Sequence, residues 1–236
     1  MKFSTLFVFT LLGVISLYGE DKGLLIFSDD FERSESQEVK DEPGNGWETN
    51  SKKRAKGDKQ VDLKDGAMHI YISPKADHGV SVTHEAEFLN GSVEMRFILL
   101  GEKDVLGLNF ADLKCKEVWA GHLFAARIGT SSIKLQDLKT GPMNLKLREA
   151  KQSKTLSSEQ KALLKTKELT FKNVLETGVW HKVVASVKGD VLSVAINGKE
   201  VATMTSEGIA HPTKRMLRLA IPHKVIVDDL KIWKKG

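Results

Sequence analysis

The sequence has a single cysteine, Cys115, among its 236 residues, so no disulfide can form within the chain. Its five prolines and 19 glycines are too few for a collagen-like or low-complexity chain. With 41% hydrophobic and 28% charged residues, the composition is that of a globular protein rather than a disordered one. The length suits one large domain or two small ones, held together by a core or by a metal rather than by disulfides.

The sequence also lacks the spacings typical of zinc enzymes. Its seven histidines are scattered, and none forms His-Glu-x-x-His or another zinc-binding pattern. Cys115 lies between Lys114 and Lys116, whose charges would favour the thiolate. No nucleophile motif surrounds this cysteine, so we interpret it as incidental.

One long apolar run is present, at residues 3–19. Lys2 precedes it, small residues end it at Gly19, and the acidic Glu20 follows at once. This arrangement is typical of a secretory signal peptide, and an uncleaved membrane anchor is the alternative. We therefore expect export to the periplasm or the extracellular space, with no membrane span after cleavage. The expected organisation is a signal peptide at 1–19 and a single domain at 20–236.

Beyond residue 60 the sequence consists of short runs in which apolar and polar residues alternate. Alternation places one face of a strand on a core and the other toward water or a partner sheet. The dipeptide Asn197-Gly198 between two such runs is the strongest hairpin signal in the chain. Many close strands without a repeated βαβ pattern predict an all-β antiparallel sandwich or jelly roll. The runs are 67–73, 79–83, 93–99, 106–110, 123–128, 133–135, 182–187, 191–196, 200–204, 215–221 and 225–233.

The segment 139–172 interrupts this pattern with a polar, lysine-rich excursion. Ser157 and Gln160 match a capping box, which predicts one short helix beginning there. The segment has nine basic and three acidic residues, a net charge of +6, whereas the whole chain has +5. The rest of the chain is therefore near neutral, and with export this argues against a nucleic-acid partner. The charge either attracts acidic glycans or an envelope surface, or solvates a long loop.

Three stretches carry a resemblance to a known fold family, in the order that the family has them. They are FSDDFER at 27–33 followed by Gly46-Trp47, GVWHKVVASVKGD at 178–190 running into VAINGK at 194–199, and VIVDDLKIW at 225–233. Together they resemble the concanavalin A-like lectin and glucanase superfamily, in its laminin-G-like and keto-disaccharide-hydrolase-like secreted bacterial modules. The resemblance implies a jelly-roll β-sandwich of two antiparallel sheets. Its concave face binds glycans in many members and is catalytic in some.

The catalytic signature of the superfamily's glucanases is absent. Those enzymes carry two glutamates on one strand, spaced close to Glu-x-Asp-x-x-Glu, and retaining hydrolysis needs two carboxylates close together. The nearest approach is Glu85 and Glu87, which would share a strand face but sit at a strand end before Asn90-Gly91. A solvated turn is the simpler interpretation of this pair.

Alternation also predicts which residues a ligand would meet. Met95, Phe97, Leu108 and Phe110 are expected in the core, and Arg127 points away from it if its apolar neighbours are buried. Polar groups collected on one face would bind sugar hydroxyls, with an aromatic platform beneath a sugar ring, or would form an ordinary solvated face. The expected substrate-binding residues are Glu94, Arg96, Asn109, Trp119, His122, Arg127, His211 and Lys214, with His122 the best catalytic candidate.

Four aspartates come from the two ends of the chain, where the resemblance implies that the first and last strands pair. Clustered carboxylates repel unless they are paired or bound to a hard cation. Related modules hold a structural calcium in such a place, so a calcium ion is the expected cofactor, and turn caps or ion pairs are the alternative. The residues are Asp29, Asp30, Asp228 and Asp229.

Three functions remain open from the sequence. The first is a secreted carbohydrate-binding module for a polysaccharide, an acidic one in view of the lysines. The second is a hydrolase or lyase of the same fold, acting on carbohydrate. The third is a structural or interaction module of the cell envelope. Convergent titratable groups in a cleft would favour the enzyme, and an exposed aromatic and polar face would favour the binding module.

Overall fold

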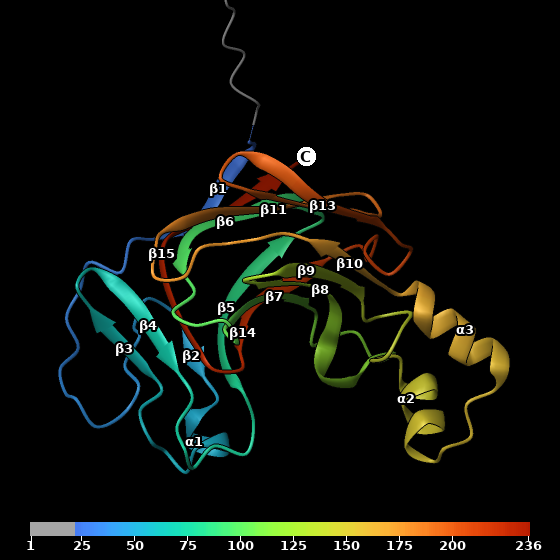
Figure 1. Cartoon of the computed structure of the whole chain (residues 1–236), viewed down its shortest axis with the longest axis horizontal. Coiled ribbons are helices and arrows are strands. Elements are labelled where there is room, and N and C mark those ends of the chain that lie inside the picture. Colours follow the sequence, from blue (N-terminus) through green and yellow to red (C-terminus); the bar gives the residue numbers. More distant parts are fainter. Residues whose placement is uncertain (1–21) are drawn as a thin grey trace, which may run out of the picture.

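The structure is a computed structural model, and it describes residues 22–236. The predicted signal peptide at 1–19 lies outside the described residues. Fifteen strands form two antiparallel sheets that pack face to face (Figure 1). The prediction of an all-β sandwich of two antiparallel sheets is confirmed.

One sheet has eight strands, and β15 (Lys224–Lys235) lies near its middle. Along β15, β6 (Asn90–Ile98) pairs on one side, and β4 (Ala67–Tyr71) and β1 (Leu24–Asp29) pair with successive parts of the strand. The strands in order are β13 (Lys199–Thr205), β12 (Val191–Ile196), β11 (His181–Lys188), β6, β15, β4 and β3 (Val61–Lys64), with β1 also on β15.

The other sheet has seven strands and β7 (Val105–Ala111) at its centre. The register places Gly107 and Asn109 of β7 beside Ala220 and Arg218 of β14 (Lys214–Ile221). The strands in order are β10 (Glu168–Lys172), β9 (Ser132–Asp137), β8 (His122–Gly129), β7, β14, β5 (Val80–Phe88) and β2 (Glu48–Thr49).

A single apolar cluster fills the space between the sheets. Met95 and Phe97 reach it from β6, and Leu108 and Phe110 reach it from β7, all almost fully buried. Phe110 stacks on Phe124 of β8 with ring centroids 4.8 Å apart. The alternation in the sequence therefore identified the inner face of both strands correctly, because side chains of neighbouring residues point to opposite faces.

The predicted hairpin at Asn197-Gly198 joins β12 to β13. Asn197 has φ 51° and Gly198 has φ 83°, the left-handed pair that a two-residue type I′ turn requires. The first and last strands of the described residues also pair as expected, since Leu24 lies opposite Lys234 and Asp29 opposite Leu230. A register shift between Asp228 and Lys231 bends β15 where β4 gives way to β1.

The excursion at 139–172 carries two helices instead of one, and ends in the edge strand β10. The predicted helix is α3 (Ser158–Thr166), and its capping box between Ser157 and Gln160 is present. The unpredicted helix is α2 (Leu145–Gln152), whose N-cap Asn144 accepts from the amides of Lys146 and Leu147. The remaining helices are α1 (Ser51–Arg54) and the short 3₁₀ turn η1 (Trp119–Gly121).

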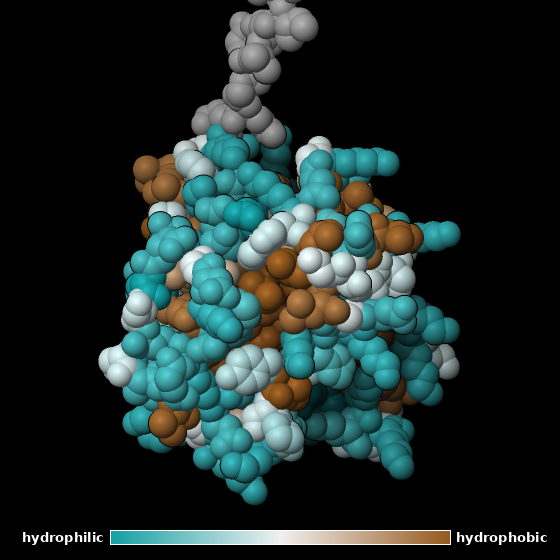
Figure 2. All heavy atoms as spheres, turned by 60° about the vertical axis from the view of Figure 1, so that its left-hand side comes forward, coloured by the Kyte–Doolittle hydropathy of each residue, from teal (hydrophilic) through white to brown (hydrophobic). Residues whose placement is uncertain are grey.

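The side of the sandwich at the β3 and β4 end is largely hydrophilic (Figure 2). Figure 2, which brings the β3 and β4 end forward, shows hydrophilic residues over most of this side, with a narrow apolar strip near its middle. No helix within residues 22–236 is both long enough and apolar enough to cross a membrane.

Candidate functional site

The outer face of the seven-stranded sheet is the candidate site, and we call it the groove face. On β7, Gly107, Asn109 and Ala111 point to this face because the alternating Leu108 and Phe110 point into the core. In Figure 1 the strands β7, β8 and β14 of this sheet lie between α1 on one side and α2 on the other. Whatever binds there meets the outward residues of β7 and its neighbours.

The middle of the groove face is lined by small side chains. Gly107 and Ala111 come from β7, Ala220 from β14 opposite Gly107, and Ala125 from β8 opposite Asn109. A Cβ added at Gly107 would lie 2.6 Å from the carbonyl oxygen of Ala220, so this position favours glycine. A floor of small residues leaves space for a ligand to approach the backbone.

A polar triad stands on this floor, formed by Arg218, His122 and Asn109. The Nδ1 atom of His122 lies 3.1 Å from Oδ1 of Asn109, which can only accept. The Nη1 atom of Arg218 lies 2.9 Å from Nδ1 and 3.1 Å from Nε2, so the guanidinium is close to both ring nitrogens. Arg218 also donates to the carbonyl oxygen of Ala120 at 3.4 Å. The triad is therefore an imidazole in contact with both an amide and a guanidinium.

Burial and positive charge both keep this imidazole neutral. Burial lowers the pKa of His122 to about 4, and the charges of Arg218, His78 and Arg148 act in the same direction. Burial also lowers the pKa of Arg218 below its ordinary value, although a guanidinium stays charged at neutral pH. A partly desolvated guanidinium is a strong donor for an anionic group, because water screens it less.

Trp119 stands at the edge of the groove face on a turn with unusual backbone geometry. Its side chain is 53% exposed. Ala120 has φ 50° and Gly121 has φ 73°, so two consecutive left-handed residues aim the turn. A Cβ on Gly121 would lie 2.7 Å from the carbonyl oxygen of Asp112, whose amide bonds back to Gly121 at 2.8 Å. This position therefore requires glycine.

A pocket of about 410 Å³ lies between Trp119 and helix α2. The guanidinium of Arg148 lies over the Trp119 ring, 4.7 Å from its centroid. The α2 residues that line the pocket share one helix face, since they follow i, i+3, i+4 and i+7 spacing. They are Leu145, Arg148, Glu149 and Gln152. The pocket joins the basic excursion to the groove face.

Four of the eight expected binding residues meet on or beside the groove face. Asn109 and His122 belong to the triad, and Trp119 stands at the edge. Arg127 is exposed on β8 opposite Gly107, on the same side of the sheet. The structure thus brings together residues from β7, η1 and β8.

Glu94 and Arg96 lie elsewhere, on the outer face of the eight-stranded sheet. Glu94 is buried beneath Lys22 at 2.8 Å and Lys182 at 3.4 Å. Burial alone would raise the pKa of Glu94, but these two cations lower it below its ordinary value. Arg96 stacks on Trp180 with its guanidinium 4.4 Å from the ring centroid. Glu94 and Arg96 are therefore engaged by neighbouring side chains, on the side of the sandwich away from the groove face.

His211 and Lys214 are also placed away from the groove floor. His211 bonds through Nε2 to Asp112 at 3.0 Å, and Arg215 bonds to the same carboxylate at 2.6 Å. Lys214 is fully buried and donates to the carbonyl oxygens of Leu89 at 2.7 Å and His211 at 3.0 Å. Burial lowers the pKa of Lys214 to about 8. This side chain anchors loops from within the core.

The expected calcium ligands are engaged by protein donors. Asp29 accepts from Arg33 at 2.6 and 3.0 Å, from Asn45 at 3.0 Å and from the Trp47 indole at 2.8 Å. Burial would raise the pKa of Asp29, but these bonds and one from the Phe31 amide lower it.

The other three aspartates are not gathered around Asp29. Asp228 and Asp229 both bond to Arg96, and Asp30 caps the amide of Glu32. Burial raises the pKa of Asp228, with the charge of Asp229 adding to the effect. The four do not form a donor set that fits calcium in the described part of the chain, so calcium remains a prediction without geometric support.

One group of carboxylates among the described residues is close enough to hold a cation, and a lysine already occupies it. Glu35, Glu38 and Asp62 have ligand atoms within 4.8 Å of one another. The Lys59 ammonium lies 2.7 Å from Glu35, 2.9 Å from Glu38 and 2.5 Å from Asp62. The cluster fastens the loop around residue 35 to β3.

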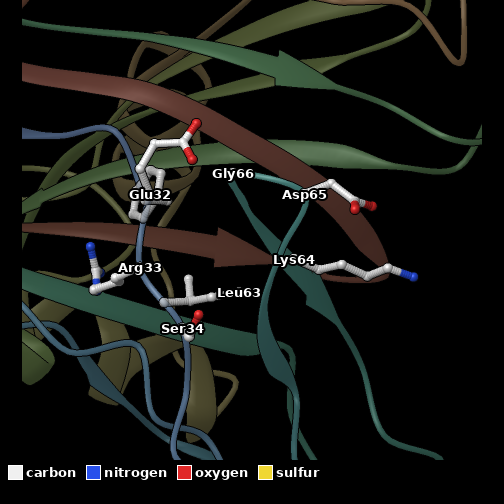
Figure 3. A pocket seen from close by; sticks show the side chains of 8 residues that line it. Glu32, Arg33, Ser34, Leu63, Lys64, Asp65 and Gly66 are labelled. Atoms are coloured by element: carbon white, nitrogen blue, oxygen red, sulfur yellow. The ribbon is translucent and has the colours of Figure 1, made fainter.

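Two further candidates show no convergence of functional groups. Glu85 is exposed on β5, and Glu87 is paired with Arg215 at 3.8 Å. A hollow of about 270 Å³ lies beside the β3–β4 hairpin, but Figure 3 shows Lys64 and Asp65 extending away from Arg33 rather than toward it. The hollow is lined by Phe31, Glu32, Arg33, Ser34, Leu63, Lys64, Asp65 and Gly66.

Sequence reasoning missed Arg218 and Arg148. The signal for Arg218 was available, because it alternates with Leu217 and Leu219 as Arg127 does with its own apolar neighbours. The signal for Arg148 was weak, since α2 buries only Leu147 and so has almost no apolar periodicity.

No family model matches the sequence, and no curated protein matches it significantly. Solved structures of similar shape do exist. The carbohydrate-binding module CBM66 from Bacillus subtilis has 8% identity and a TM-score of 0.51, covering 78% of this chain and 93% of its own. The laminarinase catalytic domain from Thermotoga maritima has 14% identity and a TM-score of 0.54, with coverages of 90% and 98%. The endo-β-1,3-glucanase from Pyrococcus furiosus has 16% identity and a TM-score of 0.52, with coverages of 88% and 93%. At these identities the likeness shows the fold alone.

Proposed function

The chain has the concanavalin A-like jelly-roll fold, and from this premise we propose that it is an exported carbohydrate-binding protein whose ligand lies on the groove face. The observation that carries the proposal is the Arg218–His122–Asn109 triad on a floor of small side chains, with Trp119 exposed at the edge. Sugars need both kinds of group, since hydroxyls bond to polar side chains and ring faces stack on aromatic ones. The similar structures include a carbohydrate-binding module and two glucanases.

The ligand is an acidic polysaccharide. Arg218 and Arg127 supply positive charge on the groove face, and Arg148 and His78 are close enough to lower the pKa of His122. Guanidinium groups bind carboxylate and sulfate oxygens through paired hydrogen bonds. A uronate or a sulfated sugar would therefore meet a complementary surface.

The groove floor favours binding over two-carboxylate hydrolysis. That chemistry needs a nucleophile and an acid near the scissile bond. The outward residues of the central strands β7 and β14 include no carboxylate; they are Val105, Gly107, Asn109, Ala111, Met216, Arg218 and Ala220. On the neighbouring strand β5, Glu85 borders this floor opposite Met216, and Glu87 is paired with Arg215 at 3.8 Å, so a ligand on the floor itself would be held by amide and guanidinium groups.

A second candidate is a polysaccharide lyase, which the neutral imidazole of His122 beside Arg218 favours. In that reaction Arg218 and Asn109 would hold a uronate carboxylate while the imidazole takes the proton next to it. The electron pair then forms a carbon–carbon double bond, the bond to the glycosidic oxygen breaks, and that oxygen takes a proton from water. The Nη1 atom of Arg218 lies 2.9 and 3.1 Å from the two imidazole nitrogens, so Arg218 would first have to move away from the ring. This requirement places the lyase second.

A glycan array with the purified protein tests the proposal, followed by product analysis on each polysaccharide that binds. We expect binding to uronate-containing or sulfated chains and no cleavage. New reducing ends or unsaturated uronate products would show that the protein is an enzyme rather than a binding module. An absence of binding to every glycan would leave a structural or interaction module of the cell envelope.

A further inference from the structure

The two helices α2 and α3 form a basic arm at residues 144–167, beyond the β10 edge of the seven-stranded sheet (Figure 1). The arm packs little against the sandwich. Helix α2 buries one residue, Leu147, and α3 buries none. Since most helical stability in proteins comes from packing an apolar face, two such helices are not explained by the core.

The cations of the arm are free of ion pairs. None of six basic side chains on it lies within 4.0 Å of a carboxylate in the described structure, whereas Lys167 at its end pairs with Asp137 and Glu207. Lys161 and Lys165 stand four residues apart on α3, where like charges weaken a helix slightly. The six are Lys146, Arg148, Lys151, Lys154, Lys161 and Lys165.

The arm is continuous with the groove face. Arg148 of α2 lies over Trp119, and the pocket of about 410 Å³ fills the space between that ring and α2. The charge of Arg148 reaches the triad, since it lowers the pKa of His122. Positive groups therefore follow one another from Arg218 past Trp119 to the helices.

We propose that the basic arm is a second binding surface for the same ligand, along which a long anionic polysaccharide continues after it leaves the groove. This inference rests on the proposed function and adds to it a dependence on chain length. Unpaired exposed cations attract a polyanion through a summed field rather than through one contact. An anionic membrane fits less well, because surface-bound helices need a broad apolar face, and each helix strongly exposes one large apolar side chain, Leu145 on α2 and Leu163 on α3.

The test uses a fourfold variant of the full chain, Lys151→Gln with Lys154→Gln, Lys161→Gln and Lys165→Gln. Its matched control makes four lysine-to-glutamine changes at exposed positions outside the arm, Lys103, Lys188, Lys199 and Lys234, so the net charge is the same. Affinity is measured for a short acidic oligosaccharide that spans only the groove face, for a long chain of the same sugars, and for phosphatidylserine vesicles. Circular dichroism and melting temperature confirm that both proteins fold, and a fourfold lysine-to-arginine variant restores the charge.

We expect the arm variant to bind the long chain about tenfold more weakly than the parent does and to bind the short one as the parent does. The lysine-to-arginine variant should bind the long chain with the affinity of the parent. Raised salt should reduce the difference between the proteins, because the Debye length shrinks. Equal losses in the arm variant and the control would overturn the inference. So would a loss confined to phosphatidylserine vesicles, which would assign the arm to a membrane. If the parent protein does not bind the short oligosaccharide, the proposed function itself fails. This outcome is distinct from a failure of the inference about the arm alone.

Discussion

The Nη1 atom of Arg218 lies 2.9 Å from Nδ1 and 3.1 Å from Nε2 of His122 on the outer face of the seven-stranded sheet. Oδ1 of Asn109 lies 3.1 Å from Nδ1 of the same ring, and burial together with the charge of Arg218 lowers the pKa of the imidazole and keeps it neutral. The guanidinium is left as the dominant charge of the groove, and it is partly buried. This arrangement suits a ligand that brings its own negative group.

Trp119→Ala should weaken glycan binding by roughly five- to tenfold, because an aromatic platform contributes about 1 kcal/mol beyond its buried area. The fold should tolerate the change, since the ring is 53% exposed. Titration calorimetry measures the loss. Trp180→Ala is the matched control, because that ring is 38% exposed and stacks on Arg96 away from the groove. Equal losses in the two variants would remove Trp119 from the ligand site.

The burial of neutral His122 predicts a loss of stability in acid. Its pKa is about 4 in the folded protein and 6.5 in the unfolded chain, so between these values the unfolded state binds more protons. The free energy of unfolding should therefore fall as the pH drops from 6.5 toward 4, by roughly 3 kcal/mol from this residue. Urea unfolding gives the free energy of unfolding of the parent protein and of His122→Gln across that pH range. The contribution of His122 is the difference between the slopes of the two plots of free energy against pH. Parallel pH profiles would mean that the imidazole is not buried in its neutral form.

Lys214 predicts a change of stability in alkali. Its pKa is about 8 when folded and 10.5 when unfolded, so the folded state binds fewer protons between these values. The cost of burying the charge is present in full below pH 8 and disappears as the pH rises toward 10.5. The stability of the protein should therefore rise over this range relative to that of Lys214→Met. A flat difference between the two proteins would show that the ammonium is solvated.

Asp29→Ala should lower the free energy of unfolding by roughly 3–5 kcal/mol, because it leaves Arg33, Asn45 and the Trp47 indole without their shared acceptor. Asp30→Ala is the control, since Asp30 caps a single exposed amide, and should cost less than about 1 kcal/mol. Thermal unfolding with and without a chelator measures both variants and the parent protein. A fall in the parent's melting temperature on chelation would support the predicted calcium site.

The fold was largely predictable from the sequence, and the composition of the site only in part. Alternation found Asn109 and Arg127 because a strand has a period of two, and this depends on local residues alone. The same rule selected Glu94 and Arg96, which face outward from the other sheet. Which sheet a strand joins depends on distant pairing, such as β6 with β11 and β15. A local pattern does not encode that choice.

Lys214 shows that one inserted residue in a strand makes the alternation rule assign a side chain to the wrong face. By parity it should share the outer face with Met216 and Arg218, but the register shift between Lys214 and Met216 turns it into the core. Arg148 illustrates the other limit, because a helix with almost no buried face carries almost no periodic signal.

The most direct test of the account is the affinity of three proteins for one acidic polysaccharide and one neutral polysaccharide, measured by titration calorimetry. The proteins are the parent, Arg218→Gln, and Arg96→Gln as a control on the opposite outer face. The account predicts that the parent binds the acidic chain and that Arg218→Gln loses roughly 10- to 100-fold, the value of a charge-assisted hydrogen bond. Arg96→Gln should bind as the parent does. Equal binding by Arg218→Gln and the parent would contradict the account.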